Sequence, residues 1–229
     1  APNDPLFSAQ WALKNTGQNQ GTAGIDINYL PAREVTQGSS DIIVAVLDHG
    51  TQLDHPDLNV SSKSYDTETG RSPSQIWGNH GTACSGIISA KTNNNLGVAG
   101  IAPNCPVMSI SNQLMGTSDA PQKRADGFNW AWRNGASVIS NSWRSSTFSE
   151  LLEDAIQSAM TNGRNGLGCV VTFSAGNYDS NTVGYPARSL PDIIVVGALS
   201  LSGKRKSSTT IDNEGWWGSD YGTQLDIMA

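Results

Sequence analysis

Charged residues are scarce in this chain, and basic residues are scarcer than acidic ones. Of its 229 residues, 14 are Lys or Arg and 20 are Asp or Glu, which gives a net charge of −6. Neutralising nucleic-acid phosphates needs clustered basic side chains, so this balance argues against nucleic acid as a partner. The chain also lacks an apolar run long enough to cross a bilayer, so no membrane partner is expected. Its seven Trp residues and its Val, Ile and Leu runs can bury a core, which argues against disorder.

Cysteine is also rare, with three residues in the chain. Cys84, Cys105 and Cys169 are odd in number and their spacing is typical of no metal site. We interpret them as small buried hydrophobic residues, although one disulfide with one free thiol also fits the count. The chain opens with Ala-Pro-Asn-Asp-Pro and has no signal peptide, as a processed mature chain would. With the low charge and an Asn-x-Ser sequon at Asn59, this favours a secreted or extracytoplasmic protein.

Short apolar segments alternate with helical patterns along the chain. The apolar segments, bounded by polar residues, suit strands that are buried on both faces. They are residues 41–47, 107–110, 136–140, 169–174 and 193–198. The helical patterns are residues 81–90, 125–133 and 149–160, the last with Ser149 as N-cap. This alternation predicts an α/β fold with three layers, a doubly wound parallel sheet with helices on both faces, in one domain over residues 1–229.

Polar residues at the ends of the predicted strands are the candidates for chemistry, because reactive groups collect at the carboxyl edge of such sheets. Asp48 follows the first strand, His80 opens a helix of small residues, and Asn177 follows the strand at 169–174. A helix N-terminus favours the neutral imidazole that a general base needs, and an amide can donate a hydrogen bond into a cleft. Alone, Asp48 is more often a cap or a turn residue and Asn177 a turn residue, and His80 could equally be a structural histidine. In the order Asp, His, amide donor they indicate a Ser-His-Asp hydrolase whose Ser comes last.

The motifs around these residues resemble those of subtilases, the subtilisin-like serine endopeptidases, for which this chain order is known. The matching segments run through the whole chain: Val46–Gly50, His55–Leu58, His80–Gly86, Gly97–Pro103, Val138–Trp143, Ser174–Asn177, Tyr185–Ala187 and Ile194–Ala198. The N-terminal Asp-Pro-Leu-Phe, the Cys after His-Gly-Thr and the Ser-Trp pair resemble the kexin-like branch in particular. The resemblance implies a subtilisin-like fold, in which Asp48 orients His80, His80 is the general base and Asn177 donates into the oxyanion hole.

The resemblance also implies that a peptide or protein substrate lies against Ser142, Trp143, Arg144 and Gly176. The family has glycine where Arg144 stands, and the acidic cluster that kexins use for dibasic substrates is absent after Trp143. Kexin specificity is therefore not carried over. His49 stands where the family has Ser, Thr or Asp, and it either perturbs the preceding carboxylate or points to solvent.

The family's nucleophile is not found at its usual place. Subtilases carry it in a Gly-Thr-Ser motif after an Ala-Pro-Gly segment, and the chain stops at Asp226–Ala229, which resembles the start of that segment. One Gly-Thr-Ser occurs at Gly116–Ser118, but it precedes the oxyanion Asn and Pro121 follows it. That context is more typical of a helix N-cap at Ser118 or Asp119.

We therefore expect the Ser on a segment beyond Ala229, carried by a second polypeptide that completes the domain, so that this chain alone is inactive. The next alternative is that the chain was artificially shortened before the Ser. A third alternative is a non-catalytic, peptide-binding pseudo-peptidase of the same fold. A Cys- or metal-dependent hydrolase is less favoured, because His49 and His55 have no thiolate or metal cluster around them.

A polar loop, Asn93–Gly97, follows the helix of His80 and offers oxygen atoms, the ligands that calcium takes. By resemblance to the kexin-like calcium site, the ligands would be the carboxylates of Asp4 and Asp57, the Asn94 side chain, and the carbonyls of Lys91, Leu96 and Val98. Calcium would then tie the N-terminus to the body of the protein. An ordinary Asn-rich turn is the alternative.

Overall fold

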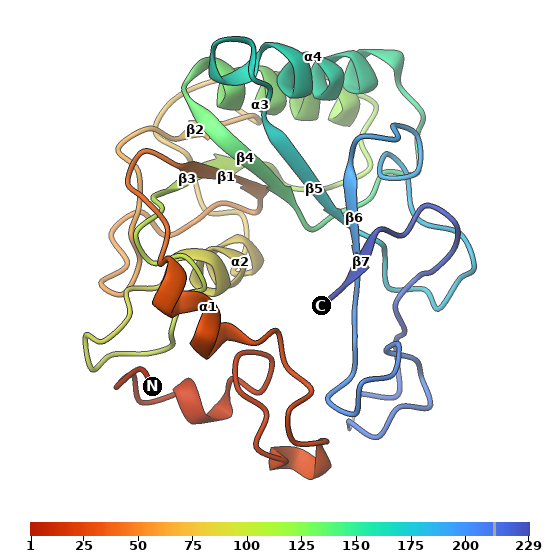
Figure 1. The fold of residues 1–229 in the computed structure, drawn as a ribbon. Helices are drawn as coiled ribbons and strands as arrows, with labels where there is room; N and C mark the ends of the chain where they lie inside the picture. The colour runs from red at the N-terminus through yellow and green to blue at the C-terminus, as the bar shows by residue number, and fades with distance from the viewer. Residues whose placement is uncertain (213) are drawn as a thin grey trace.

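A parallel sheet forms the centre of the computed structural model, which describes residues 1–212 and 214–229 (Figure 1). Within these residues the sheet has seven strands in the order β2-β3-β1-β4-β5-β6-β7, and every pair is parallel. The strands are β1 (Ile43–Asp48), β2 (Tyr65–Asp66), β3 (Val107–Ser111), β4 (Ala136–Asn141), β5 (Val170–Ser174), β6 (Ile194–Gly197) and β7 (Ile227–Met228). The five predicted strands are confirmed. The two edge strands were not predicted, because two residues carry no hydrophobic pattern.

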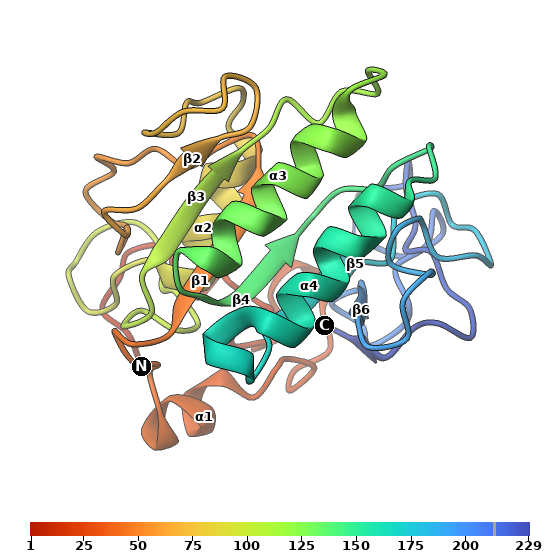
Figure 2. The same cartoon turned by 90° about the horizontal axis from the view of Figure 1, so that it is seen from above.

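Helices cover both faces of the sheet (Figures 1 and 2). On one face α3 (Ala120–Arg133) and α4 (Glu150–Gly166) lie side by side, and on the other lie α1 (Tyr29–Val35) and α2 (His80–Ser89). Two short 3₁₀ turns, η1 (Phe7–Ala9) and η2 (Gln18–Gln20), precede them. The predicted three-layer α/β architecture is confirmed.

The burial of β1 explains why the sheet needs two helical layers. Its residues from Val44 to Asp48 are all buried, so both faces of the strand must be covered. On the α4 side the cover comes from Leu152, Ile156 and their neighbours on one helical stripe. As predicted, Ser149 caps this helix, and its hydroxyl accepts the N–H of Leu152 at 3.3 Å.

The start of α3 lies five residues before the predicted one. Asp119 occupies the N-cap and a proline lies in the first turn, which suits a helix start. The Asp119 side chain makes no cap hydrogen bond. Instead it pairs with Lys123 at 2.9 Å, and hydrogen bonds from Thr117 and Lys123 lower the pKa of its carboxyl group.

The three cysteines are free thiols. Cys105 and Cys169 are buried and Cys84 is partly buried, so the interpretation as small hydrophobic residues holds for two of them and the disulfide alternative is wrong. No helix in the described part of the chain combines the length and the apolarity needed to span a membrane.

Candidate active site

Three neighbouring strands bring the predicted site residues to one edge of the sheet. Asp48 is the last residue of β1, Ser142 follows β4, and Asn177 comes shortly after β5. Because β1, β4 and β5 are adjacent and parallel, their carboxyl ends share this edge. His80, the first residue of α2, joins them from the helical layer beside β1.

Asp48 and His80 are in direct hydrogen-bond contact. His80 Nδ1 lies 2.8 Å and 2.9 Å from the two carboxylate oxygens of Asp48. The Asp48 side chain is 1% exposed and that of His80 is 49% exposed. The backbone N–H of His49 also donates to the carboxylate, at 2.7 Å. A carboxylate fixed in this way holds the proton on Nδ1, so Nε2 is the basic nitrogen of the ring.

Two glycines allow this contact to form. Gly50 has a φ of +94°, and a Cβ there would collide with the Gln75 carbonyl oxygen. A Cβ at Gly81 would lie only 2.9 Å from the backbone nitrogen of Gly50. The first turn of α2 therefore lies directly against the chain that leaves β1, and this approach carries His80 to Asp48.

His49 lies inside the site. Its ring stands edge-on to that of His80, with 6.2 Å between the centroids and 75° between the planes. A Cβ at Gly78 would lie 2.8 Å from His49 Nδ1, so the ring is held against this glycine on its other side. The His49 ring is partly buried beside His80, so it does not simply point to solvent, and an effect of His49 on the Asp48 carboxylate stays a prediction.

Cys84 lies one turn into α2, next to the ring nitrogen of His80 that Asp48 contacts. Its Sγ is 3.8 Å from His80 Nδ1. Burial raises the pKa of the Cys84 thiol, and the charge of Asp48 raises it further, so the thiol stays protonated and weakly nucleophilic. With Asp48 and His80 it forms the one group of three possible metal ligands, among the described residues, whose ligand atoms lie within 4.8 Å. The Asp48–His80 hydrogen bond already uses two of these atoms.

A cleft of about 550 Å³ opens beside these residues. It is lined by Ser142, Trp143, Arg144, Ser174, Gly176, Asn177, Tyr178, Trp216 and Trp217. All four predicted substrate-binding residues and Asn177 therefore border one cavity. The Trp143 side chain is largely buried, with its ring 5.0 Å from that of Phe173 in a T-shaped contact.

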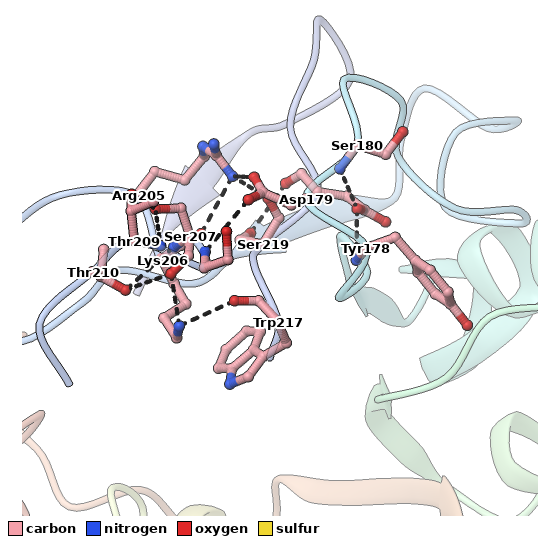
Figure 3. Close-up of polar contacts among 12 residues, drawn as sticks. Tyr178, Asp179, Ser180, Arg205, Lys206, Ser207, Thr209, Thr210, Trp217 and Ser219 are labelled. Carbon is pink, nitrogen blue, oxygen red and sulfur yellow. Dashed lines mark hydrogen bonds and ion pairs between the residues drawn. The ribbon is translucent and has the colours of Figure 1, made fainter. Parts of the chain in front are cut away.

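Trp216 and Trp217 form one wall of the cleft. The buried side chain of Lys206 holds the loop that carries them, and Figure 3 shows its contact with Trp217. Lys206 is 2% exposed, and its ammonium donates to the carbonyls of Ser207, Glu214 and Trp217 at 2.9, 2.8 and 3.1 Å. A buried ammonium is tolerated only when its charge and donors are paired, and here three carbonyls of one loop and the carboxylate of Asp212, 3.4 Å away, pair them. The ammonium also lies 4.8 Å from the centre of the Trp217 ring.

The predicted calcium ligands Asp4, Asp57 and Asn94 meet at the loop that follows α2. Asp4 accepts the backbone N–H groups of Asn93 and Asn94 at 3.0 and 3.3 Å. The Asn94 amide donates to Asp57 at 2.7 Å. Its oxygen accepts the N–H of Leu96, so a metal-ligating amide would have to rotate.

Both carboxylates of this loop are buried, since Asp4 is 4% exposed and Asp57 is 3% exposed. Within the described chain neither forms an ion pair. Gly97, with a φ of +52°, lies so close that a Cβ there would collide with an Asp57 oxygen. Two buried, uncompensated carboxylates in a tight oxygen-rich loop fit a divalent cation such as calcium.

Comparisons with known proteins assign the chain to a family. Residues 39–229 match the family described as "Subtilase family". The chain belongs to the subtilases. It is 33% identical over 228 residues to a thermophilic serine proteinase of Bacillus sp. (strain AK1), covering 98% of this chain and 52% of that protein. It is 31% identical to a calcium-dependent protease of Nostoc sp. (strain PCC 7120), covering 92% of this chain and 34% of that protein.

Other subtilases extend the comparison. Subtilisin E of Bacillus subtilis (strain 168) is 34% identical over 196 residues, covering 83% of this chain and 46% of that protein. A solved structure of proteases from Pseudoalteromonas arctica has a TM-score of 0.78 at 28% identity, covering 100% of this chain and 71% of that one. The chain spans about half the length, or less, of these curated relatives. The kexin-like branch within the subtilases stays a prediction.

The Gly-Thr-Ser sequence of this subtilase does not line the cleft that Asn177 borders. Ser118 is exposed in the turn before α3, and Gly116 and Thr117 border a neighbouring cavity of about 250 Å³. That cavity shares Arg144 and Tyr178 with the cleft and does not include His80 or Asn177. The location agrees with the interpretation of this segment as a helix N-cap.

Sequence reasoning missed Tyr178, Trp216, Trp217 and Lys206. Tyr178 directly follows Asn177, so an aromatic side chain beside a predicted oxyanion donor was a usable signal. The Trp pair sits in a polar stretch where large aromatic residues have no core to fill, which also hints at a binding surface. Lys206 had no signal, because its hydrogen bonds go to backbone carbonyls and its one ion-pair partner, Asp212, lies in a loop with no recognisable pattern.

Proposed function

We propose that this chain carries the Asp-His part of a Ser-His-Asp triad and the substrate cleft of a serine endopeptidase that hydrolyses peptide bonds. The observation that carries the proposal is the Asp48–His80 contact, placed beside a cleft that Asn177 borders. Membership of the subtilases and the names of the relatives, serine proteinase and subtilisin, support it. We also propose a secreted or extracytoplasmic location and a single domain.

Each residue has a role in this proposal. His80 Nε2 takes the proton of the nucleophilic Ser and returns it to the leaving amine. Asp48 keeps the other ring nitrogen protonated and stabilises the imidazolium that forms. Asn177 donates a hydrogen bond to the oxyanion of the tetrahedral intermediate.

The nucleophilic Ser, in this proposal, lies on a segment beyond Ala229. Ala229 borders a mainly apolar cavity of about 560 Å³, together with the ends of β4, β5 and β6 and with Ile87 of α2. Ile87 also borders a second apolar cavity, of about 1060 Å³, along α2. A polypeptide that follows Ala229 would enter the first cavity and reach the side of α2 that carries His80.

The energetics favour a covering segment. Burying one aliphatic side chain is worth about 1.5–3 kcal/mol, and a helix across the two cavities would bury several. Total folding stability is only about 5–15 kcal/mol, so leaving this surface exposed would cost a large part of it. We therefore propose that a second polypeptide supplies both the cover and the Ser, and that the chain of residues 1–229 is inactive by itself.

A fluorophosphonate probe tests the proposed function. We expect the protein completed by the following segment to be labelled on one Ser, residues 1–229 alone to remain unlabelled, and His80→Ala to abolish labelling. Intact-mass spectrometry of every polypeptide in the sample identifies the labelled chain. A complete, folded protein that the probe does not label would instead be a non-catalytic peptide-binding protein.

We further propose that Asp4, Asp57 and Asn94 hold a calcium ion with the carbonyls of Lys91, Leu96 and Val98. The buried carboxylates are the supporting observation, and the calcium-dependent protease of Nostoc is a relative. Bound calcium supplies positive charge that offsets the two carboxylates and ties the N-terminal segment to the loop after α2. It takes no part in the peptide-bond chemistry proposed above.

Calcium should raise the unfolding temperature of this chain, and Asp57→Asn should abolish that increase. A ligand at a hundred times its Kd adds about 2.7 kcal/mol of stability, because it binds only the folded state. Scanning calorimetry with EGTA and with excess calcium measures the increment for each variant. Asp54→Asn, which changes an exposed carboxylate nearby, is the matched control and should keep the increment. An equal increment in the Asp57 variant would refute the site.

A further inference from the structure

Arg144 presents a positive charge inside the substrate cleft. It follows β4 by three residues and its side chain is exposed. Its guanidinium carbon lies 4.0 Å from the centre of the Tyr178 ring, and both residues line the cleft with Asn177. Stacking uses the flat face of the guanidinium and leaves its N–H donors free at the edge.

The Arg144 side chain has packing partners at both of its ends. Its guanidinium stacks on the ring of Tyr178, and Gly184 lies against its stem, where a Cβ would come within 3.3 Å of Arg144 Cβ. A stacked arginine loses less freedom when a ligand binds than a free one does, which favours affinity.

The charge of Arg144 has no counter-ion in the described structure. Its guanidinium forms neither an ion pair nor a hydrogen bond with a described residue. The residues that line the cleft include no Asp or Glu, although acidic residues outnumber basic ones in the chain. The cleft therefore carries one positive charge in a protein of net negative charge.

A neighbouring cavity strengthens the positive character of this region. It measures about 400 Å³ and shares Arg144 with the cleft. Arg188 lines it as well, with several Ser and Thr side chains and with no acidic residue. Two exposed guanidinium groups near each other raise the local potential and favour an anionic group.

We propose that the cleft selects peptides with an acidic side chain next to the scissile bond, and that Arg144 binds the carboxylate of that side chain. A planar guanidinium with free edge donors matches a carboxylate in a bidentate pair. Trp216 and Trp217 on the opposite wall contact the apolar stem of the side chain. This inference rests on the proposed function and adds the substrate class: acidic peptides, bound through Arg144.

Peptide binding tests the inference without requiring catalysis. Four capped peptides, acetyl-Ala-Ala-Pro-Xaa-amide with Glu, Gln, Lys or Phe as Xaa, are titrated by calorimetry into the completed protein carrying His80→Ala, which does not hydrolyse them. We expect the Glu peptide to bind about tenfold tighter than the Gln peptide, since a carboxylate forms a charge-assisted pair with the guanidinium and a neutral amide does not. Rising ionic strength should reduce this ratio.

Two variants assign the preference to one residue. Arg144→Gln should bring the Glu and Gln peptides to equal affinity. Arg133→Gln removes another exposed arginine, which stacks on Trp132 with 5.1 Å to the ring centre at the end of α3, and should leave the ratio unchanged. Equal binding of Glu and Gln peptides to the protein that keeps Arg144, tighter binding of Phe, a ratio that survives Arg144→Gln, or no binding would each overturn the inference.

Hydrolysis of the same peptides by the completed protein separates this inference from the proposed function. A Glu preference in binding without any hydrolysis contradicts the endopeptidase proposal and leaves the role of Arg144 standing. Hydrolysis of all four peptides with equal kcat/KM supports the endopeptidase and refutes the role of Arg144.

Discussion

Replacing Asp48 by Asn should lower kcat of the completed protease by about 10⁴-fold, the loss expected when a triad carboxylate becomes an amide. The introduced amide would present an N–H group to His80 Nδ1, which then has to accept a hydrogen bond. The ring proton would move to Nε2, the nitrogen that must receive the proton of the Ser. The change keeps the size of a fully buried side chain, so the fold should be retained.

Cys84→Ala is the matched control for this prediction. Its thiol also touches His80 Nδ1, at 3.8 Å, so the variant changes a contact of the same ring nitrogen. We expect kcat within about threefold of the unaltered protein, because a protonated thiol on that side neither orients the ring nor attacks the substrate. Loss of activity in the Cys84 variant with retention in Asp48→Asn would replace the Ser mechanism by a thiol mechanism. Nitrogen NMR of the His80 ring reports the tautomer in each variant.

Replacing Phe173 by Ala should lower the free energy of unfolding by about 3–5 kcal/mol, the usual cost of removing a buried aromatic side chain. Phe173 is 1% exposed and contacts the rings of Trp143 and Phe128, with centroids 5.0 and 6.3 Å away. Total stability is about 5–15 kcal/mol, so this one cavity removes a large share of it. Urea unfolding followed by circular dichroism measures the change.

Phe148→Ala provides the comparison for the core prediction. Phe148 is 63% exposed and should cost less than about 1 kcal/mol, because little apolar surface is lost from the core. A similar cost for both variants would mean that the region around β5 repacks without a cavity. Because Phe173 directly precedes Ser174 and Asn177 follows shortly after, its loss should also loosen the cleft, which would appear as a raised KM.

The central strands could be predicted from the sequence, but the strand order could not. The run at 41–47 is apolar throughout most of its length, and this pattern alone indicates a strand covered on both faces. Which strands become its neighbours depends on packing between distant segments, such as the pairing of Val44 with Val107 and with Val138. The start of α3 was placed too late because its first turn carries no apolar face.

The places of Asp48 and Asn177 follow from the predicted strands, since residues at the carboxyl ends of parallel strands share an edge. The contact of His80 with Asp48 depends in addition on the close approach of Gly81 to Gly50, which no strand pattern predicts. The wall of the cleft does not follow from any local pattern. Trp217 comes long after Asn177 in the chain, and backbone carbonyls bonded to Lys206 hold it in place. Every residue has a carbonyl, so a contact of this type leaves no mark on the amino-acid pattern. The stacking of Arg144 on Tyr178 could not be predicted either, because the two residues lie in loops that follow different strands and are far apart in the sequence.

The way Lys206 holds its loop has a consequence for how this cleft can diversify. The Lys206 ammonium donates mainly to backbone carbonyl oxygens. A substitution in the loop changes a side chain but leaves these carbonyls present. The outward-facing Trp216, 76% exposed, can therefore be exchanged for other residues while the loop keeps its course. The backbone course of this loop and the side chain that it presents to the cleft can therefore change independently. A library randomised at Trp216 on an unchanged Lys206 would sample new preferences on a fixed frame.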